Sequence, residues 1–431
     1  MTPLAEILNG FSGNVTGSDI IDTPAIDRMR SMGIVVSIGH SAENVRGAGY
    51  VIRTAAARED NVEIVAARNL GIPIFERAQV WGYIMRGYRD AVCISGVHGK
   101  TTTTSMVAHI LLSADADPTI MIGGTLPALG SGYRVGKGDV IVLESCEYYN
   151  SFHNFCPTVA VVLNVDADHL DFFRDLDDLK SSFRKFAALV PEGGTIVCNG
   201  DDENTMDALA PLNRDLLTFG FGDAARVRGI NVSASGKETS MEVLRDGEPL
   251  CKIKLQVPGM HNLKNALAAA AACMAIGVPA QAVEDGLLGF GGVCRRFEYK
   301  GNFNGADVYD DYAHHPCELR ALLDAVSTLG SYKRTILAFQ PHTFSRTKAL
   351  FSDFVRELAR ADVTLLAEIY AARERNDVGI TSDTLAKAVP GAKCCKEFCE
   401  IAEEIKAIAR DGDIILTVGA GDIYKVGEAL V

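Results

Sequence analysis

The chain has 431 residues, more than one hydrophobic core normally holds, and 48% of them are hydrophobic. This composition predicts a folded protein of about three domains and excludes the disordered and fibrous classes. Acidic side chains outnumber basic ones by 55 to 42, and the net charge of -13 argues against binding to nucleic acids or to anionic membranes.

Cysteine usage and apolar runs bear on where the protein works. The 11 cysteines are an odd number without CxxC spacing, which predicts reduced thiols rather than disulfides. The N-terminus has no signal-peptide pattern, and no apolar run approaches the ~18 residues that a membrane span requires. We therefore expect a cytoplasmic protein without membrane insertion, as a monomer or a weak homodimer.

The first predicted elements are a helix, a turn and a strand over residues 3–19. Asp19 ends the strand, where an acid meets a ribose in the second half of a dinucleotide-type βαβ unit. The first strand and the glycine-rich turn that normally precede such a helix are absent from the sequence. Strands and helices then alternate to about residue 76, which predicts a Rossmann-like domain over 1–87 that lacks its first strand and glycine-rich loop.

A second set of strands and helices begins at residues 91–95 and predicts a mostly parallel sheet. A more polar, alternating stretch over 214–257 predicts antiparallel strands, and an alanine-rich helix over 262–277 closes the set. We place this central domain at 88–292. Its other predicted strands are DVIVLES, VAVVLNV and GGTIVCNGDD.

A third set occupies residues 293–431 and follows a turn-rich stretch over 287–305. Strands and helices alternate again, with one predicted helix over 347–361, and this indicates a second Rossmann-like sheet. The whole chain is therefore predicted to be α/β with three domains. The other predicted elements of the third set are DVYDDYAHH, PCELRALLDAVSTLG, RTILAFQPH, DVTLLAEIY and DIILTVGAGD.

The stretch CISGVHGKTTTTSM, residues 93–106, follows a predicted strand and starts a helix with four threonines, which are poor helix formers. Its glycines allow a close backbone approach, its N–H groups attract phosphate, and Lys100 can reach the outer phosphates of a nucleotide. The usual Walker pattern has a glycine five positions before Gly99, where this chain has Ile94. We predict a nucleoside triphosphate site, with an ordinary strand-to-helix turn as the alternative.

Acidic side chains follow two neighbouring predicted strands of the central domain. Glu144 ends one strand, and Asp166, Asp168 and His169 follow another. Because the carboxyl ends of parallel strands meet at one edge, these groups predict a Mg²⁺ site beside the triphosphate. The histidine indicates more than one ion, and simple capping of strand ends is the alternative.

Two further pairs of side chains are candidates for nucleotide contacts. Asn262 and Asn265 share a helix face, where their amides suit an adenine edge, although Asn262 could instead cap the helix. Arg295 and Arg296 lie near a predicted domain junction, where they could clamp phosphate or form a solvated surface pair.

Eight motifs in this order resemble the Mur ligase family, from residue 4 to 431. The motifs are GVHGKTTTTS, LESCEYYNSF, NVDADHLD, PGMHNLKN, CRRFE, DDYAHHP, QPHTFSRT and GAGDIY. The resemblance implies a three-domain enzyme in which ATP phosphorylates the lactyl carboxylate of UDP-N-acetylmuramate and the amine of L-alanine attacks the acyl phosphate. That reaction belongs to peptidoglycan precursor synthesis.

The loop pattern and the resemblance together imply a role for each site residue. ATP binding falls to Gly96, His98, Gly99, Lys100, Thr101, Thr102, Asn262, Asn265, Arg296 and Asp311. Thr101 and Glu144 would hold one Mg²⁺ and His169 a second, and the catalytic residues would be Lys100, His169, Arg296 and Asp311. The UDP-sugar would meet Asp19 and His40, and alanine would meet Tyr312, His314 and Arg346.

Some relatives carry arginine where this chain has Thr343, so Arg346 would bind the amino-acid carboxylate alone. Two other interpretations stay open. The chain could be the related ligase that attaches a recycled tripeptide to the same sugar, although QPHTFSR should then differ. It could also be a nucleotide-binding regulatory or scaffold member without turnover, which the missing N-terminal loop favours. Folylpolyglutamate synthase is more distant, because it should lack DDYAHHP.

Overall fold

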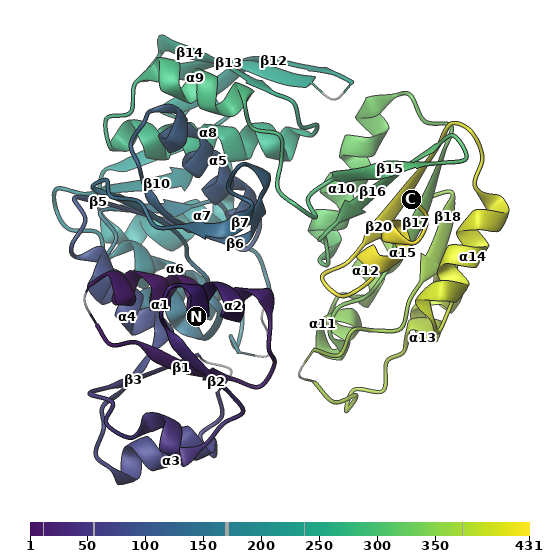
Figure 1. Cartoon of the computed structure of the whole chain (residues 1–431). Coiled ribbons are helices and arrows are strands. Elements are labelled where there is room, and N and C mark those ends of the chain that lie inside the picture. The colour runs from purple at the N-terminus through teal and green to yellow at the C-terminus, as the bar shows by residue number, and fades with distance from the viewer. Residues whose placement is uncertain (12, 55–56, 169–171, 237, 373) are drawn as a thin grey trace.

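Four sheets organise the computed structural model, which describes residues 1–431 except 12, 55–56, 169–171, 237 and 373 (Figure 1). Helices alternate with mostly parallel strands, so the predicted α/β class is confirmed. All 11 cysteines are free thiols, as predicted. Among the described residues, no helix has the length and apolar character needed to cross a membrane.

The N-terminal strands form two separate parallel pairs. The elements in chain order are α1 (Thr2–Gly10), β1 (Thr16–Asp19), α2 (Pro24–Ser31), β2 (Val35–Ile38), η1 (Ala42–Val45), β3 (Val51–Arg53), α3 (Val62–Asn69), β4 (Ile74–Glu76) and α4 (Arg77–Met85). β1 pairs with β2, and β3 with β4. α1 and α4 do not cover these pairs alone, because Leu4, Ile7 and Trp81 share a buried cluster with Cys93 of the next sheet.

The central sheet has the strand order β14-β13-β12-β11-β10-β9-β5-β8-β6-β7. Its strands are β5 (Asp90–Ser95), β6 (Thr119–Leu126), β7 (Ser131–Arg134), β8 (Val140–Glu144), β9 (Val159–Val162), β10 (Thr195–Asn199), β11 (Leu216–Gly220), β12 (Val227–Ser235), β13 (Glu238–Arg245) and β14 (Glu248–Leu255). The antiparallel prediction is confirmed for β12 to β14, whereas β11 runs parallel to β10. β5 lies between β8 and β9, so the carboxyl ends of these three strands meet at one edge.

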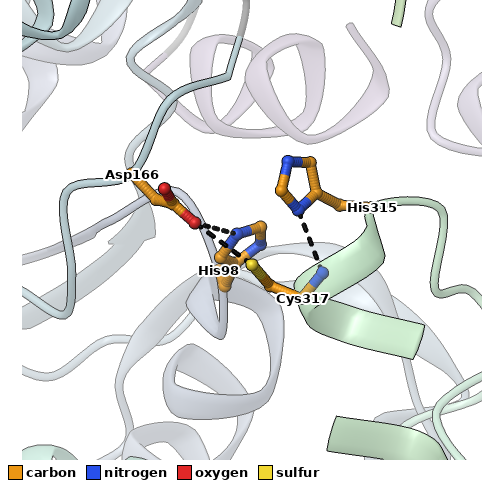
Figure 2. A group of neighbouring side chains, drawn as sticks. All are labelled: His98, Asp166, His315 and Cys317. Carbon is orange, nitrogen blue, oxygen red and sulfur yellow. Dashed lines mark hydrogen bonds and ion pairs between the residues drawn. The ribbon is translucent and has the colours of Figure 1, made fainter. Parts of the chain in front are cut away.

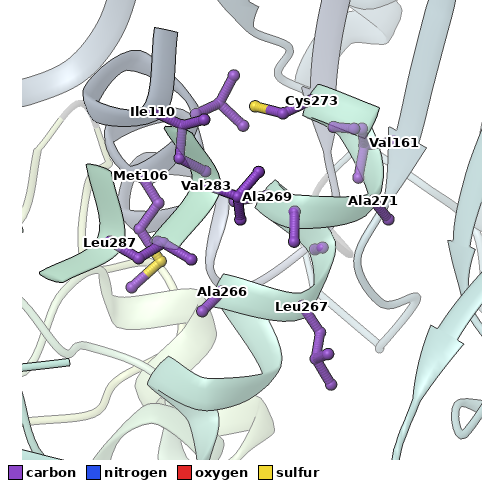
Figure 3. Close-up of a cluster of buried hydrophobic side chains, with 14 of the residues drawn as sticks. Met106, Ile110, Val161, Ala266, Leu267, Ala269, Ala271, Cys273, Val283 and Leu287 are labelled. Carbon is purple, nitrogen blue, oxygen red and sulfur yellow. The ribbon is translucent and has the colours of Figure 1, made fainter. Parts of the chain in front are cut away.

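Helices cover both faces of the central sheet. They are α5 (Lys100–Ser113), η2 (Pro127–Leu129), η3 (Tyr148–Asn154), α6 (Leu176–Ala187), α7 (Glu203–Leu209), η4 (Ala210–Leu212), α8 (Met260–Ala275) and α9 (Ala280–Leu288). Figure 3 shows Met106 and Ile110 of α5 gathered with Ala269 of α8 and Val283 of α9 in one buried cluster. The short alanine side chains of α8 let these helices pack closely, which fixes the start of α5 relative to α8.

The C-terminal sheet forms a separate lobe, coloured green to yellow in Figure 1, with the strand order β15-β16-β20-β17-β18-β19. Its elements are β15 (Glu298–Phe303), β16 (Ala306–Asp311), α10 (Pro316–Leu329), β17 (Arg334–Phe339), α11 (Phe344–Ala349), α12 (Phe351–Leu358), β18 (Val363–Leu366), α13 (Ser382–Ala388), β19 (Lys393–Cys394), α14 (Phe398–Ile408), β20 (Asp413–Val418) and α15 (Tyr424–Glu428). Two buried clusters, one on each face, hold the helices on the sheet.

Two sequence predictions in this region were wrong in detail. The stretch predicted as turn-rich contains the last residues of α9 and the edge strand β15, which pairs antiparallel with β16 through a register shift between Tyr299 and Gly301. The single helix predicted over 347–361 is two helices, because Leu350 leaves the helical conformation with φ -107° and ψ 25°.

Candidate active site

The glycine turn after β5 requires glycine at both of its ends. Gly99 has φ 85°, and a Cβ there would lie 2.6 Å from Asn265 Oδ1. Gly96 has φ 140°, and a Cβ there would lie 2.8 Å from Leu163 Cβ. No described side chain caps the first turn of α5, so its backbone N–H groups can meet an anion. The strand, the glycine turn and the start of the helix therefore have the geometry that the sequence pattern predicts.

Lys100 is buried and already paired. Its Nζ donates to both carboxylate oxygens of Glu147, at 3.0 and 3.2 Å, and to the carbonyls of Gly96 and Val97. Burial alone would lower the pKa of Lys100, but the Glu147 carboxylate outweighs it and the pKa is raised. A nucleotide phosphate at the turn would have to share this cation with Glu147, a residue that the sequence interpretation missed.

Thr101 and Glu144 meet as predicted for metal ligands. Thr101 Oγ1 donates to Glu144 Oε1 at 3.1 Å, and the Gly123 N–H donates to Glu144 Oε2 at 2.6 Å. An added Cβ on Gly123 would lie 2.5 Å from Glu144 Oε1, so glycine keeps this space open for the carboxylate. Adjacent hydroxyl and carboxylate oxygens fit Mg²⁺, which prefers hard oxygen ligands. The third predicted ligand, His169, lies outside the described residues.

A cavity of about 190 Å³ opens beside the glycine turn. It is lined by the two large lobes, which are the central lobe, built on the ten-stranded sheet, and the C-terminal lobe, built on the six-stranded sheet. The structure brings most of the predicted nucleotide residues together there. Asn262 does not cap α8, because the N-cap is Gly259 and no described side chain caps the helix; its amide instead donates to the Pro258 carbonyl at 2.7 Å. The predicted residues that line the cavity are His98, Gly99, Thr102, Asn262, Asn265, Arg296 and Asp311.

Glu318 connects the glycine turn to the C-terminal lobe. Its Oε1 lies 3.5 Å from His98 Nδ1 and 3.9 Å from Arg296 Nη1, and its Oε2 lies 3.5 Å from His314 Nδ1. Burial alone would raise the pKa of Glu318, but the facing His314, His98 and Arg296 lower it well below its usual range. The sequence interpretation missed Glu318, although it is the third residue of a helix that begins at Pro316, where a glutamate is a capping signal.

The two arginines of the CRRFE motif have different environments. Arg295 adopts φ 61° and donates to Asp310 Oδ2 at 2.9 Å and to the Gly419 carbonyl at 2.6 Å. Its guanidinium lies over the rings of Tyr312 and Tyr424, at 5.0 and 4.6 Å from their centroids. Arg295 is thus neither a phosphate clamp nor a solvated surface residue, and it braces the C-terminal lobe.

Arg295→Met and Arg296→Met are expected to separate stability from nucleotide binding. Arg295→Met removes the cation paired with the buried Asp310 carboxylate and should lower the free energy of unfolding by about 3–5 kcal/mol, with little effect on the KM for ATP. Arg296→Met should raise that KM by roughly 10-fold to 100-fold, because one charged hydrogen bond contributes about 1.5–3 kcal/mol. Thermal unfolding and steady-state kinetics of both variants check this; a reversed pattern would contradict it.

Asp311 is a buried carboxylate that holds the backbone beside the cavity. It accepts hydrogen bonds from the N–H groups of Phe297 and Ala313, each at 2.7 Å. Burial raises its pKa to about 6, against the opposing charge of Arg296. Asp311 therefore orders the chain on either side of Arg296 and lines the cavity with it.

Asp311→Asn should become more stabilising, relative to the wild type, as pH rises. Folding raises the pKa of this acid from 3.8 to about 6, so the folded state holds the proton more tightly and stability falls as pH rises through this window. This rise in the pKa corresponds to a loss of roughly 3 kcal/mol of stability in the wild type between low and high pH. The asparagine amide does not titrate, so the variant does not lose this stability. Urea unfolding of both proteins at about pH 4 and about pH 8 measures it. An equal difference at the two pH values would refute the assignment.

Arg346 of α11 pairs with Asp168, which follows β9 in the other lobe. The guanidinium makes three contacts with the two carboxylate oxygens, at 2.9, 3.2 and 3.2 Å, and both side chains are 10% exposed. His342 Nδ1 lies 3.2 Å from Arg346 Nη1, and the His342 ring lies 5.4 Å from that of His314. The ring centroid of Tyr312 lies 5.6 Å from that of His314. The three residues predicted to bind the amino acid, Tyr312, His314 and Arg346, therefore lie near one another.

Asp19 is the last residue of β1, and His40 follows the neighbouring strand β2. Asp19 Oδ1 accepts from the Ile20 N–H at 2.7 Å. His40 Nδ1 lies 3.2 Å from Ser18 Oγ and 3.3 Å from Glu63 Oε2. The pair lies at one end of the β1-β2 sheet, and Glu63 is a third polar group there that the sequence interpretation missed.

Family models match most of the chain, and known relatives match nearly all of it. Residues 1–89 match the Mur ligase family catalytic domain, 94–273 the Mur ligase middle domain, and 295–421 the Mur ligase glutamate ligase domain. A protein of Caldanaerobacter subterraneus subsp. tengcongensis named UDP-N-acetylmuramate–L-alanine ligase is 44% identical over 434 residues, which cover 99% of this chain and 94% of that protein. The chain belongs to the Mur ligase family. The family inferred from the eight motifs is confirmed.

Other Mur ligases agree with this placement. A protein of the same name from Acetivibrio thermocellus is 43% identical over 99% of this chain and 92% of its own. The crystal structure of a UDP-N-acetylmuramate-alanine ligase from Thermotoga maritima matches with a TM-score of 0.82 at 30% identity, over 100% of this chain and 95% of that one. A murein peptide ligase from Psychrobacter arcticus, with a TM-score of 0.71 at 22% identity over 100% and 95% of the two chains, shares the fold. The three-domain Mur ligase fold expected from the sequence is confirmed.

Proposed function

We propose that the chain is an ATP-dependent ligase that joins L-alanine to the lactyl carboxylate of UDP-N-acetylmuramate, with ADP and phosphate as the other products. Whole-chain similarity to ligases of that name carries the proposal. The contacts of the site support it, because the glycine turn, the Thr101–Glu144 oxygens and Arg346 provide for a triphosphate, a hard cation and a carboxylate.

The three parts of the chain would divide the substrates among them. Residues 1–87 would bind the UDP-sugar through Asp19 and His40, and residues 88–292 would bind ATP. Residues 293–431 would bring alanine through Tyr312, His314 and Arg346. The cavity lined by both large lobes supports this division, because Arg296 and Asp311 of the third part face the glycine turn of the second.

A carboxylate is a poor acyl donor because its leaving group would be oxide, so the acid must first be phosphorylated. Lys100 would stabilise the charge on the transferred phosphoryl group. Mg²⁺ held by Thr101 and Glu144 would neutralise charge on the triphosphate, and the proposed second ion rests on His169, outside the described residues. Phosphate then leaves readily when the alanine amine attacks, provided that the lobes exclude water.

The alanine carboxylate would take the place of Asp168 on Arg346. In the structure described here, the guanidinium already has a bidentate anionic partner in Asp168, because its Nε donates to Oδ1 and its Nη2 to Oδ2. An amino-acid carboxylate has the same planar geometry and charge, so it can accept the same two N–H groups. This exchange would leave the alanine amine on the side of the central lobe, from which Asp168 comes.

Phosphate release tests the proposal and its nearest competitor together. The protein is incubated with ATP, Mg²⁺ and UDP-N-acetylmuramate, with either L-alanine or the tripeptide L-alanyl-γ-D-glutamyl-diaminopimelate. Release that depends on L-alanine is expected. Release only with the tripeptide would assign the chain to the recycling ligases, and no release with either would favour a nucleotide-binding member without turnover.

A further inference from the structure

Four side chains with metal-binding atoms meet where the two large lobes touch (Figure 2). His98 comes from the glycine turn and Asp166 from the loop after β9, whereas His315 and Cys317 come from the start of α10. One ligand atom from each side chain lies within 4.8 Å of the others. Within the described part of the chain, no second cluster of this kind is found.

Two of the distances already match the edges of a tetrahedral site. Cys317 Sγ lies 3.3 Å from Asp166 Oδ2, and His98 Nε2 lies 3.6 Å from the same oxygen. Zinc bonds of about 2.0–2.3 Å place tetrahedral ligands roughly 3.3–3.7 Å apart. The widest separation, up to 4.8 Å, needs a contraction of about 1 Å, which side-chain rotations can supply.

The His315 imidazole has a buried nitrogen atom without a hydrogen bond in the described part of the chain. His315 is 4% exposed, and its Nδ1 accepts the Cys317 N–H at 3.3 Å as the cap of α10. Its Nε2 is buried and makes no hydrogen bond to a described residue, whereas Nε2 of His98 has only the Asp166 carboxylate at 3.6 Å. Leaving a buried polar atom unsatisfied costs about 1–3 kcal/mol. A cation between the two rings would remove this cost for His315 and would give His98 Nε2 a direct partner.

The donor types select the metal. Two imidazoles, one thiolate and one carboxylate suit a borderline-soft ion such as Zn²⁺, whereas Mg²⁺ prefers the oxygens of Thr101 and Glu144. We propose that His98, Asp166, His315 and Cys317 form a Zn²⁺ site that is separate from the Mg²⁺ site. As the Zn–S bond forms, the Cys317 thiol releases its proton to solvent.

Zinc at this site would tie the glycine turn to α10. His98 and Cys317 both line the cavity beside the turn, so a shared ion holds the two lobes together there. The ion would also fix His98 at the turn where phosphates bind. We therefore expect micromolar Zn²⁺ to inhibit the ligase, a consequence that rests on the proposed function, whereas metal binding itself does not.

Titration of the apo full chain with Co²⁺, a spectroscopic probe for zinc sites, tests the proposal. The wild type should bind one equivalent and develop the intense d–d bands of tetrahedral cobalt with a thiolate-to-cobalt charge-transfer band. Cys317→Ser should lose the charge-transfer band and bind roughly tenfold or more weakly. Cys399→Ser, which changes an exposed thiol on α14, is the matched control and should behave as the wild type.

A second variant keeps the test decisive if Cys317→Ser folds poorly. His315→Asn retains a capping side chain for α10 but removes the ring Nε2, and it should also weaken Co²⁺ binding roughly tenfold or more. Absence of a charge-transfer band in the wild type, or its full retention in Cys317→Ser, would overturn the proposal. Because this readout needs no turnover, it stands apart from failure of the ligase assay.

Discussion

Lys100→Met is expected to lower kcat/KM for ATP by roughly 10³ or more, because Lys100 is the cation placed at the glycine turn to stabilise the charge on the transferred phosphoryl group. Methionine preserves the aliphatic length and removes only the ammonium. ADP release with saturating UDP-N-acetylmuramate and L-alanine measures the effect. Activity within about tenfold of the wild type would mean that the turn does not serve phosphoryl transfer.

The same substitution should also destabilise the protein, for a separate reason. Glu147 is 1% exposed at its side chain, and Lys100→Met removes a cation paired with this buried carboxylate, at a cost of about 3–5 kcal/mol. Lys100→Met combined with Glu147→Gln should recover most of this stability, since the amide carries no charge, and should stay inactive. A double variant that recovers activity would show that the loss in Lys100→Met came from misfolding.

The alternation of buried strands and helices was sufficient to predict the α/β class, because parallel strands are apolar on both faces and leave a strong signal. The positive φ values of Gly96 and Gly99 were equally local, because they belong to the strand–turn–helix unit that the motif defines. The tight contacts of these glycines could not be predicted from the motif. They are made by Leu163, which follows β9, and by Asn265 of α8, so they depend on how distant segments pack against the turn.

The partners of the charged residues could not be read from the sequence. Glu147 follows Glu144 by three positions, and only the irregular turn into η3 directs one carboxylate to Lys100 and the other to Thr101. Arg295 and Arg296 are adjacent and chemically identical. A positive φ at Arg295 and two stacked tyrosine rings, contributed by distant segments, decide which one faces the cavity.

The partners of the acidic residues that follow β9 could not be predicted from the sequence either. Asp166 and Asp168 were both candidates for one Mg²⁺ site by their sequence position. In the structure Asp166 meets His98 and Cys317, whereas Asp168 meets Arg346. The contacts of Asp166 with Cys317 and of Asp168 with Arg346 cross between lobes, so they depend on how the C-terminal lobe docks, which local patterns do not encode.

Arg346→Gln is expected to raise the KM for L-alanine by roughly 10²-fold to 10³-fold while the KM for ATP changes little. The guanidinium would make two charge-assisted hydrogen bonds to the amino-acid carboxylate, each contributing about 1.5–3 kcal/mol, and an amide offers one neutral donor pair. Initial rates with L-alanine varied at saturating ATP and UDP-N-acetylmuramate measure the change. An unchanged KM for L-alanine would place the amino-acid site elsewhere.

Asp168→Asn is the matched test of competition for this guanidinium. If alanine must displace Asp168 from Arg346, removal of the carboxylate charge weakens the competing partner, and the KM for L-alanine should fall. Arg346→Gln also removes the guanidinium from the buried Asp168 carboxylate, with a stability loss of about 3–5 kcal/mol that the double variant Arg346→Gln/Asp168→Asn should largely reverse. The double variant should still bind alanine weakly, because recovering the fold does not replace the guanidinium. A rise in the KM for L-alanine in Asp168→Asn would show instead that Asp168 orients Arg346 for the substrate.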